Sequence, residues 1–175
     1  MLEISNLSKT FNKNTINEKI ALDHINLTLK EGDFVTVIGG NGAGKSTLLN
    51  AICGAWNIDA GKILLDGINI TNMADYKRAK FLGRVFQDPM MGTAGEMEIA
   101  ENLAIANRRS KRRTLRWGMK KQEKANYQTL LAQLDLGLEN RLTSKVGLLS
   151  GGQRQALTLL MATLQKPKLL LLDEH

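Results

Sequence analysis

Alternating apolar and polar residues dominate the first part of the chain and predict short strands joined by turns. Leu2 and Ile4 alternate with polar neighbours, and the apolar residues of 21–30 (ALDHINLTLK) follow the same period of two. This period is typical of a strand with one buried face. Residues 61–70 (GKILLDGINI) carry an Asp-Gly pair between two apolar stretches, which favours a hairpin, and a further strand is expected at 83–87 (GRVFQ).

Two continuous apolar runs predict strands that are buried on both faces. The run 34–38 (FVTVI) is short and rich in β-branched residues, and the run 169–172 (LLLL) follows a proline that ends a helix. Residues 46–56 have helical character, and residues 93–165 contain no proline and favour helix by composition. This order of elements indicates an α/β core that carries a helical insertion.

Composition limits the class of protein. The chain has 175 residues, of which 43% are hydrophobic and 23% charged, as is ordinary for one soluble globular domain. This excludes a disordered, collagen-like or disulfide-scaffold chain, and the one cysteine, Cys53, is expected to be a small core residue. No apolar run approaches the ~20 residues of a membrane span, and the start lacks the order of a signal peptide, so we expect a cytoplasmic protein.

A glycine-rich loop carries the clearest chemical signal. Residues 39–47 (GGNGAGKST) match the pattern G-x-x-x-x-G-K-[ST] between a predicted strand and a predicted helix. Glycines let backbone N–H groups turn inward around phosphate oxygens, and the following helix adds a partial positive charge. Lys45 is expected to reach the β- and γ-phosphates, and the Ser46 hydroxyl to ligate Mg²⁺. The loop residues expected to bind the nucleotide are Gly39, Asn41, Gly42, Gly44, Lys45, Ser46 and Thr47.

Two carboxylates follow the apolar run 169–172. In open α/β sheets, ligands bind at the carboxyl ends of the strands. Asp173 is therefore expected to hold Mg²⁺ beside Ser46, directly or through water, and Glu174 to accept a proton from the attacking water. Four leucines and two acidic residues are a weak signal alone, but a strong one downstream of a phosphate-binding loop.

A second glycine motif, LSGGQRQ at 149–155, precedes another helical stretch. Ser150 is a favourable N-cap, and Gln153 stands three residues later, in the position of a capping box. Such a helix start is a second anion site, because its backbone N–H groups and the helix dipole both favour negative charge. An ordinary capped helix does not explain Gly151 and Gly152, since glycines weaken a helix start unless something must approach it closely.

These motifs, together with VFQDP at 85–89, resemble in this order the ATP-binding cassette family of transport ATPases. The resemblance runs from about residue 1 to the end, and LSGGQ is that family's signature. It implies an α/β fold: a P-loop NTPase core with a mostly parallel sheet, an antiparallel β subdomain at the N-terminus, and an inserted helical subdomain. The expected parts are a nucleotide-binding core at 1–87, a helical subdomain at 88–150, and the signature helix with the Walker B strand at 151–175.

The resemblance also implies a site that two subunits share. Phe11 matches the aromatic residue that stacks on adenine, and Gln87 the glutamine that senses Mg²⁺. The family forms head-to-tail dimers, here with a partner expected to be identical, in which ATP lies between the loop 39–47 of one subunit and Ser150, Gly151, Gly152 and Gln153 of the other. The implied catalytic residues are Lys45, Gln87 and Glu174, and the implied metal ligands are Ser46, Gln87 and Asp173.

The resemblance further implies an ATPase that powers a separate membrane permease. ENLAIA at 101–106 is more similar to bacterial importers than to exporters, so we expect uptake and a peripheral place on the inner face of the cell membrane. A DNA-repair or chromosome-organising ATPase would carry a long coiled coil between the two glycine motifs, but about a hundred residues without heptads separate them. A translation-factor member of the family is a further alternative.

Family members continue beyond the Walker B strand with an aspartate loop, further core strands and a switch histidine. This sequence stops at His175, which aligns beside the catalytic glutamate and not with the switch histidine. We therefore expect a fragment or an incomplete gene product that lacks the C-terminal core strands. Such a fragment is expected to bind nucleotide without turnover.

Positive charge is concentrated in one segment. The net charge is +7, and residues 108–124 alone hold nine Lys or Arg and one Glu. Three interpretations remain open: a solvated helical face, a patch near anionic lipid headgroups or an acidic permease loop, and nucleic-acid binding with Trp117 stacking among the arginines. The last is the least favoured, because a single aromatic residue in a basic run is weak evidence.

Overall fold

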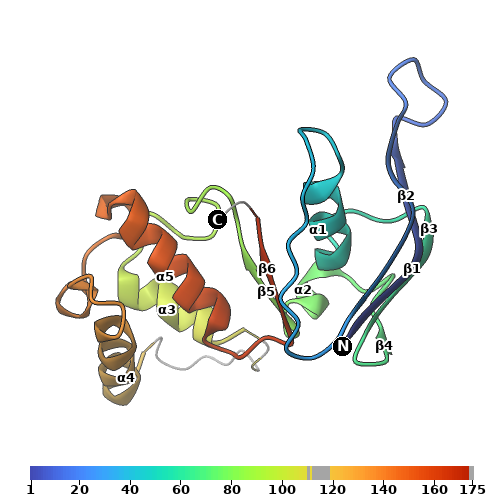
Figure 1. Ribbon diagram of the computed structural model, residues 1–175. Coiled ribbons are helices and arrows are strands. Elements are labelled where there is room, and N and C mark those ends of the chain that lie inside the picture. Colours follow the sequence, from blue (N-terminus) through green and yellow to red (C-terminus); the bar gives the residue numbers. More distant parts are fainter. Residues whose placement is uncertain (110, 112–118, 174–175) are drawn as a thin grey trace. The chain divides into compact units, whose positions relative to one another are not determined.

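The computed structural model describes residues 1–109, 111 and 119–173 (Figure 1). The chain divides into two compact units, Met1–Ala79 and Lys80–His175. The three-part division at residues 87 and 150 that the family resemblance implies stays a prediction. Among the described residues, no helix has both the length and the apolar character that crossing a membrane requires.

The first unit is built on a four-stranded antiparallel sheet with the strand order β2-β1-β3-β4. Alternate residues of β1 and β3, such as Leu2, Ile4 and Ile63, are buried, as the period of two predicts. The hairpin is confirmed: Asp66 and Gly67 have φ of 47° and 74°, the left-handed conformation that a tight two-residue turn needs. The strands are β1 (Leu2–Phe11), β2 (Lys19–Leu29), β3 (Ala60–Leu65) and β4 (Ile68–Asn69).

Helix α1 (Lys45–Cys53) follows the glycine-rich loop, as predicted, and α2 (Asp75–Arg78) is a single turn. Arg78 is 3% exposed, and its guanidinium donates hydrogen bonds to the carbonyl oxygens of Ala51 and Ile52, at 2.8 and 2.9 Å. It donates two more to Thr71 and Met73. The last carbonyls of a helix lack partners within it and attract cations, so Arg78 closes the C-terminal end of α1. Burial lowers the pKa of Arg78.

The run 34–38 differs from the prediction of a strand buried on both faces. Residues 34–40 form no strand, and Phe34 and Ile38 are 88% and 90% exposed. A strand needs neighbours that complete its ladder of hydrogen bonds. No strand among residues 1–109 and 119–173 pairs with this run, so its apolar, β-branched composition alone does not make it a strand.

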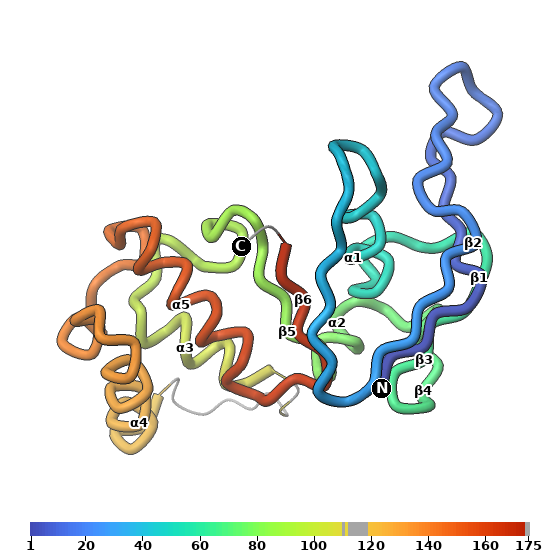
Figure 2. The backbone as a smooth tube through the Cα atoms, in the orientation of Figure 1, coloured from blue at the N-terminus to red at the C-terminus, as the bar shows by residue number. Residues whose placement is uncertain are grey.

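The second unit contains one pair of parallel strands, β5 (Leu82–Val85) and β6 (Leu169–Leu172), which run side by side in Figure 2. Among the described strands, β5 and β6 are the only two that pair in parallel, since the others pair antiparallel. Both strands were predicted, although β6 is less buried than its four leucines suggested, since Leu172 is 40% exposed. The pair places Gln87 and Asp173, which follow β5 and β6, at the same edge.

Helices α3, α4 and α5 lie within residues 93–165, where the composition predicts helix. Helices α3 and α5 lie side by side (Figures 1 and 2), and Leu103, Tyr127, Leu131 and Leu157 form part of the common core with α4. The Tyr127 hydroxyl in this core accepts a hydrogen bond from the Asn107 side chain at 3.0 Å. The elements are α3 (Ile99–Asn107), α4 (Lys121–Ala132), α5 (Gly151–Thr163) and the 3₁₀ turns η1 (Leu138–Asn140) and η2 (Val146–Leu148).

Candidate nucleotide site

The glycine-rich loop turns directly into α1, and its shape depends on Gly44. This residue caps the helix with φ of 89°, a left-handed conformation that side chains rarely adopt. A Cβ atom at Gly44 would also collide with the carbonyl oxygen of Ala21 in β2. The loop therefore sits against the sheet at a distance that only glycine allows, with the N-terminus of α1 behind it.

The Lys45 side chain spans this loop. Its ammonium group donates hydrogen bonds to the carbonyl oxygens of Gly39 and Gly40, at 2.6 and 3.1 Å. These bonds hold a positive charge over the same loop whose helix N-terminus favours anions. The arrangement is suited to a phosphate group, which would replace the two carbonyl oxygens as the partner of Lys45.

A second cation lies beside the loop, and the sequence analysis missed it. Lys19 is the register partner of Phe11 across β1 and β2. Its Nζ lies 3.1 Å from the point that a Cβ atom of Gly42 would occupy. Lys19 therefore links the end of β1 to the phosphate-binding loop within the same unit. No local signal in the sequence identifies Lys19, because its place opposite Phe11 comes from the pairing of β1 with β2.

Phe11 ends β1 and packs against Trp56, which follows α1. The ring centroids are 4.8 Å apart at an interplanar angle of 80°, the edge-to-face arrangement that aromatic pairs favour. The Lys9 ammonium lies 5.4 Å from the Phe11 ring. Phe11 was singled out from the family resemblance, but its partner Trp56 was not. A ring that is held from one side in this way is suited to stack a planar base.

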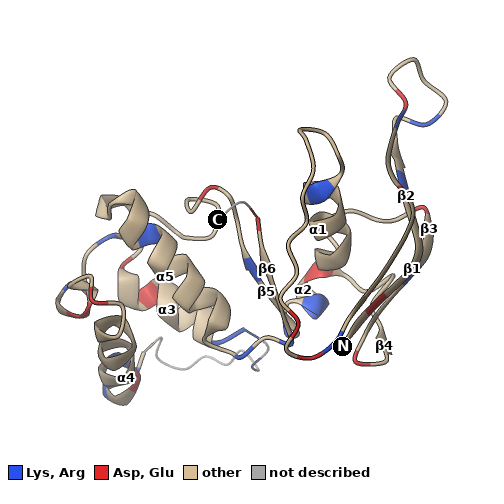
Figure 3. Cartoon of the chain, in the orientation of Figure 1, with Lys and Arg blue, Asp and Glu red and all other residues tan. Residues whose placement is uncertain are grey.

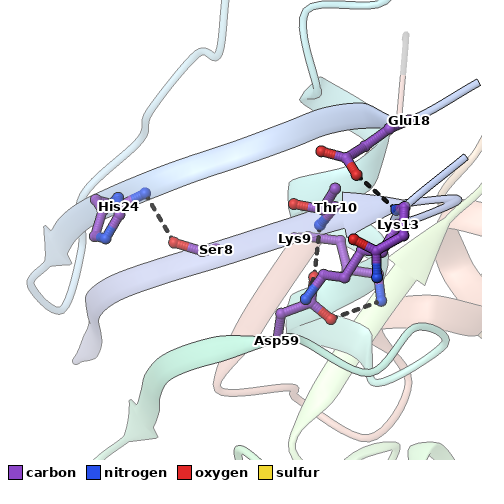
Figure 4. A network of polar contacts seen from close by, with 8 residues as sticks. Ser8, Lys9, Thr10, Lys13, Glu18, His24 and Asp59 are labelled. Carbon is purple, nitrogen blue, oxygen red and sulfur yellow. Dashed lines mark hydrogen bonds and ion pairs between the residues drawn. The ribbon is translucent and has the colours of Figure 1, made fainter. Parts of the chain in front are cut away.

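Asp59 anchors the strand that carries Phe11 (Figure 4). Its carboxylate accepts a hydrogen bond from the Thr10 backbone N–H at 2.6 Å, and Lys9 and Lys13 lie within 3.4 and 3.3 Å. The Thr10 N–H, helped by the two lysines, holds the pKa of Asp59 below its usual value against the opposing effect of burial. This network fixes the end of β1.

The β5–β6 edge carries the acidic candidate of the second unit. Asp173 follows β6, and its backbone N–H donates to the carbonyl oxygen of Val85 at 3.2 Å. The same carboxylate forms an ion pair with Arg84 of β5 at 3.6 Å. The structure thus joins Asp173 to a residue that the sequence analysis did not select. The other acidic candidate, Glu174, lies outside the described residues, as does His175.

The second glycine motif begins α5 as predicted. Gln153 N donates to Ser150 Oγ at 3.3 Å, and Ser150 N donates to the Gln153 side chain at 3.2 Å, which completes the capping box. A Cβ atom at Gly151 or Gly152 would meet no atom of the described chain within 4 Å. Among the described residues, space is therefore open above both glycines.

The comparisons with known proteins connect these features. The family model described as "ABC transporter" matches residues 22–175, which is most of the chain. The chain belongs to the ABC transporter family. Solved structures confirm its fold as well. One of them is an ATP-binding cassette that was solved as a dimer in a post-hydrolysis state bound to ADP and Pi. It superimposes with a TM-score of 0.82 at 27% identity, and the match covers 99% of this chain and 73% of that one. A nucleotide-free ABC transporter cassette has a TM-score of 0.76 at 29% identity, over 99% and 68%.

Two curated relatives are transport proteins. A tyrosine transport ATP-binding protein of Clostridioides difficile is 46% identical over 180 residues, which cover all of this chain and 69% of that protein. The spermidine/putrescine import ATP-binding protein PotA of Haemophilus influenzae is 35% identical over 174 residues, which cover 99% of this chain but only 42% of PotA. The chain thus spans about two thirds of the first relative and less than half of the second.

The residues predicted to hold Mg²⁺ are oxygen donors, with Ser46 in the first unit and Gln87 and Asp173 in the second. Asp173 offers a carboxylate, Ser46 a hydroxyl and Gln87 an amide oxygen, the ligand types that this hard cation prefers. Within the described residues, no group of three or more His, Cys, Asp or Glu side chains could hold a metal ion. Magnesium in nucleotide sites usually needs only one or two carboxylates, because phosphates and waters complete its shell.

Proposed function

We propose that this chain is the ATP-binding and ATP-hydrolysing subunit of an ABC transporter that drives uptake through a separate permease. The observation that carries the proposal is the phosphate-binding loop, with Lys45 across it and α1 behind it, in a chain of this family. The names of the two relatives support transport, and that of PotA supports import. The proposed place is the cytoplasmic face of the membrane, at the permease.

The first unit supplies the groups that bind ATP. Phe11, supported by Trp56, stacks on the adenine. The loop N–H groups and Lys45 hold the phosphates, and the further loop residues in contact with them are Gly39, Asn41, Gly42, Gly44, Ser46 and Thr47.

The second unit supplies the groups that act on the bound nucleotide. Glu174 is the general base that takes the proton of the attacking water, and Gln87 helps to orient the reacting groups. Together with Ser46 of the first unit, Gln87 and Asp173 would hold Mg²⁺, which would neutralise charge on the phosphates. The open space above Gly151 and Gly152 supports a partner subunit whose ATP meets Ser150–Gln153, so each site is completed in trans in a head-to-tail homodimer.

The role proposed for the basic segment 108–124 is an additional contact with the membrane surface. Residues 110 and 112–118, Trp117 among them, lie outside the described residues. Anionic lipid headgroups beside the permease are the proposed partner, because basic clusters favour such surfaces. Salt-dependent binding to phosphatidylserine vesicles, with no binding to RNA, is the expected result, and the reverse would favour a nucleic-acid partner.

Calorimetry with Mg–ATP, combined with phosphate release, tests the proposed function. We expect the chain to bind ATP and the Lys45→Ala variant to bind it about ten-fold more weakly or worse, since hydrogen bonds to charged groups contribute roughly 1.5–3 kcal/mol. Lys62→Gln removes the same charge from an exposed position in β3 and serves as the matched control. Binding without phosphate release would favour the alternative of a nucleotide-binding chain without turnover, and no binding would contradict the proposal.

A further inference from the structure

Arg84 lies at the β5–β6 edge that carries Asp173, directly before the VFQDP motif at 85–89. It stands in β5, a strand with a basic residue (Figure 3), and is the register partner of Leu171 in β6. Because side chains alternate between the faces of a strand, Arg84 and Phe86 share one face with Leu171 and Asp173. Arg84 Nη2 lies 3.6 Å from Asp173 Oδ2.

Packing holds the Arg84 guanidinium in this position. It lies 4.4 Å from the centroid of the Phe86 ring, a cation–π contact. The side chains of Arg84 and Asp173 are only 17% and 16% exposed. Arg84 Nε is buried and has no hydrogen-bond partner among the described residues. The charge of Arg84 is therefore only partly screened by water where it faces Asp173.

This inference rests on the proposed function, in which Asp173 holds the Mg²⁺ of Mg–ATP. We propose that Arg84 competes with Mg²⁺ for the Asp173 carboxylate and so raises the Mg²⁺ concentration that the site requires. Two cations that share one carboxylate repel each other, and Phe86 keeps the guanidinium from moving away. While the metal is absent, Arg84 neutralises Asp173 and stabilises the β5–β6 edge.

A purely structural role for Arg84 makes the opposite prediction. If Arg84 only fixed the Asp173 side chain in place, its removal would disorder the carboxylate and weaken metal binding. If Arg84 competes with the metal, its removal strengthens metal binding. The sign of the change in metal affinity therefore separates the two roles, without any measurement of catalytic rate.

Electron paramagnetic resonance with Mn²⁺ as the probe shows whether the metal affinity rises or falls when Arg84 is replaced. Mn²⁺ is titrated into the chain saturated with a non-hydrolysable ATP analogue, and the free Mn²⁺ signal is read. Arg84→Gln and Arg84→Met are expected to lower the dissociation constant of Mn²⁺ about five-fold, the effect of removing one partly screened charge near the ligand. Arg84→Lys, which keeps the charge, and Lys62→Gln, which removes one from β3, should stay within about two-fold of the original chain.

Two controls make each outcome decisive. Analogue binding in EDTA should be the same for all variants, and thermal unfolding should show that each is folded. Unchanged or weaker Mn²⁺ binding in the neutral variants would overturn the role of Arg84, as would loss of folding in both while Arg84→Lys stays folded. Failure of the original chain to bind the analogue at all would instead overturn the proposed function, on which this inference depends.

Discussion

Phe11 stands at the point where the polar network of β1 meets an aromatic pair. Its edge-to-face contact with Trp56 orients the ring, while Asp59 fixes the backbone one residue earlier. The ring is therefore held before any nucleotide arrives, which lowers the entropy that binding must overcome.

Phe11→Ala should weaken ATP binding about ten-fold, because stacking of a base on an aromatic side chain contributes roughly 1–3 kcal/mol. Phe11→Tyr should keep the affinity, since it keeps the ring. Inorganic tripolyphosphate, which has no base, serves as the control ligand in calorimetry and should bind both variants equally well. A ten-fold loss for tripolyphosphate as well would show that Phe11 acts on the loop and not on the base.

The pH dependence of stability should report on Asp59. Its pKa in the folded chain is lowered, chiefly by the Thr10 N–H, so its carboxylate stabilises the fold above the ordinary aspartate pKa of ~3.9. That stabilisation is lost as the pH falls through the lower pKa of the folded chain. Asp59→Asn should unfold at a lower temperature than the original chain at pH 7, and the difference should shrink below pH ~4. A difference that is constant from pH 7 to 3 would contradict this account.

At the scale of elements, α1 depends on a residue outside its own sequence. Arg78 places its guanidinium against the last carbonyls of α1, and a Cβ atom at Gly54 would collide with it. The helix that presents the phosphate-binding loop is thus held at its far end by a buried cation. Breaking this contact would leave several buried carbonyl groups without donors.

Arg78→Ala should therefore destabilise the chain by about 3 kcal/mol or more, since losses of this size follow from breaking a buried polar network. Lys77→Ala is the matched control, because Lys77 precedes Arg78 in α2 but is exposed, and it should change the stability by less than ~0.5 kcal/mol. Urea denaturation measures both. Equal effects of the two substitutions would remove the assigned role of Arg78.

Elements whose signal is local were predictable from the sequence. The hairpin at Asp66-Gly67, the glycine-rich loop before α1 and the Ser150–Gln153 capping box each depend on a few neighbouring residues. The absence of a strand at 34–38 was not predictable from those residues alone, because a strand takes its hydrogen bonds from other strands. The contacts of Arg78 with Ala51 and of Arg84 with Asp173 join residues far apart in the sequence, and no local pattern predicts them.

At the scale of the whole molecule, the candidate residues are divided between the two units. Phe11 and the phosphate-binding loop belong to the first, and Gln87, Asp173 and Ser150 to the second. The proposed trans arrangement adds a second copy of the chain to each site. Nucleotide, metal and self-association should therefore be linked, because a ligand shared by two subunits stabilises the dimer by mass action.

Sedimentation of the Glu174→Gln variant should show this linkage. Mg–ATP is expected to shift the variant from monomer to dimer, since loss of the general base blocks hydrolysis while the phosphate contacts remain. The double variant with Ser150→Ala should dimerise more weakly, although its monomer binds ATP with unchanged affinity. Equal dimer dissociation constants for the two variants would show that the ATP does not contact Ser150 of the partner.

The most direct test of the central claim is a calorimetric titration of Mg–ATP into the chain and into its Lys45→Ala variant. The account predicts saturable binding at one site per chain, and a loss of about ten-fold or more in affinity when the Lys45 charge is removed. Equal affinity of the two chains, or no binding to either, would contradict the claim that the loop 39–47 holds the phosphates of a nucleotide.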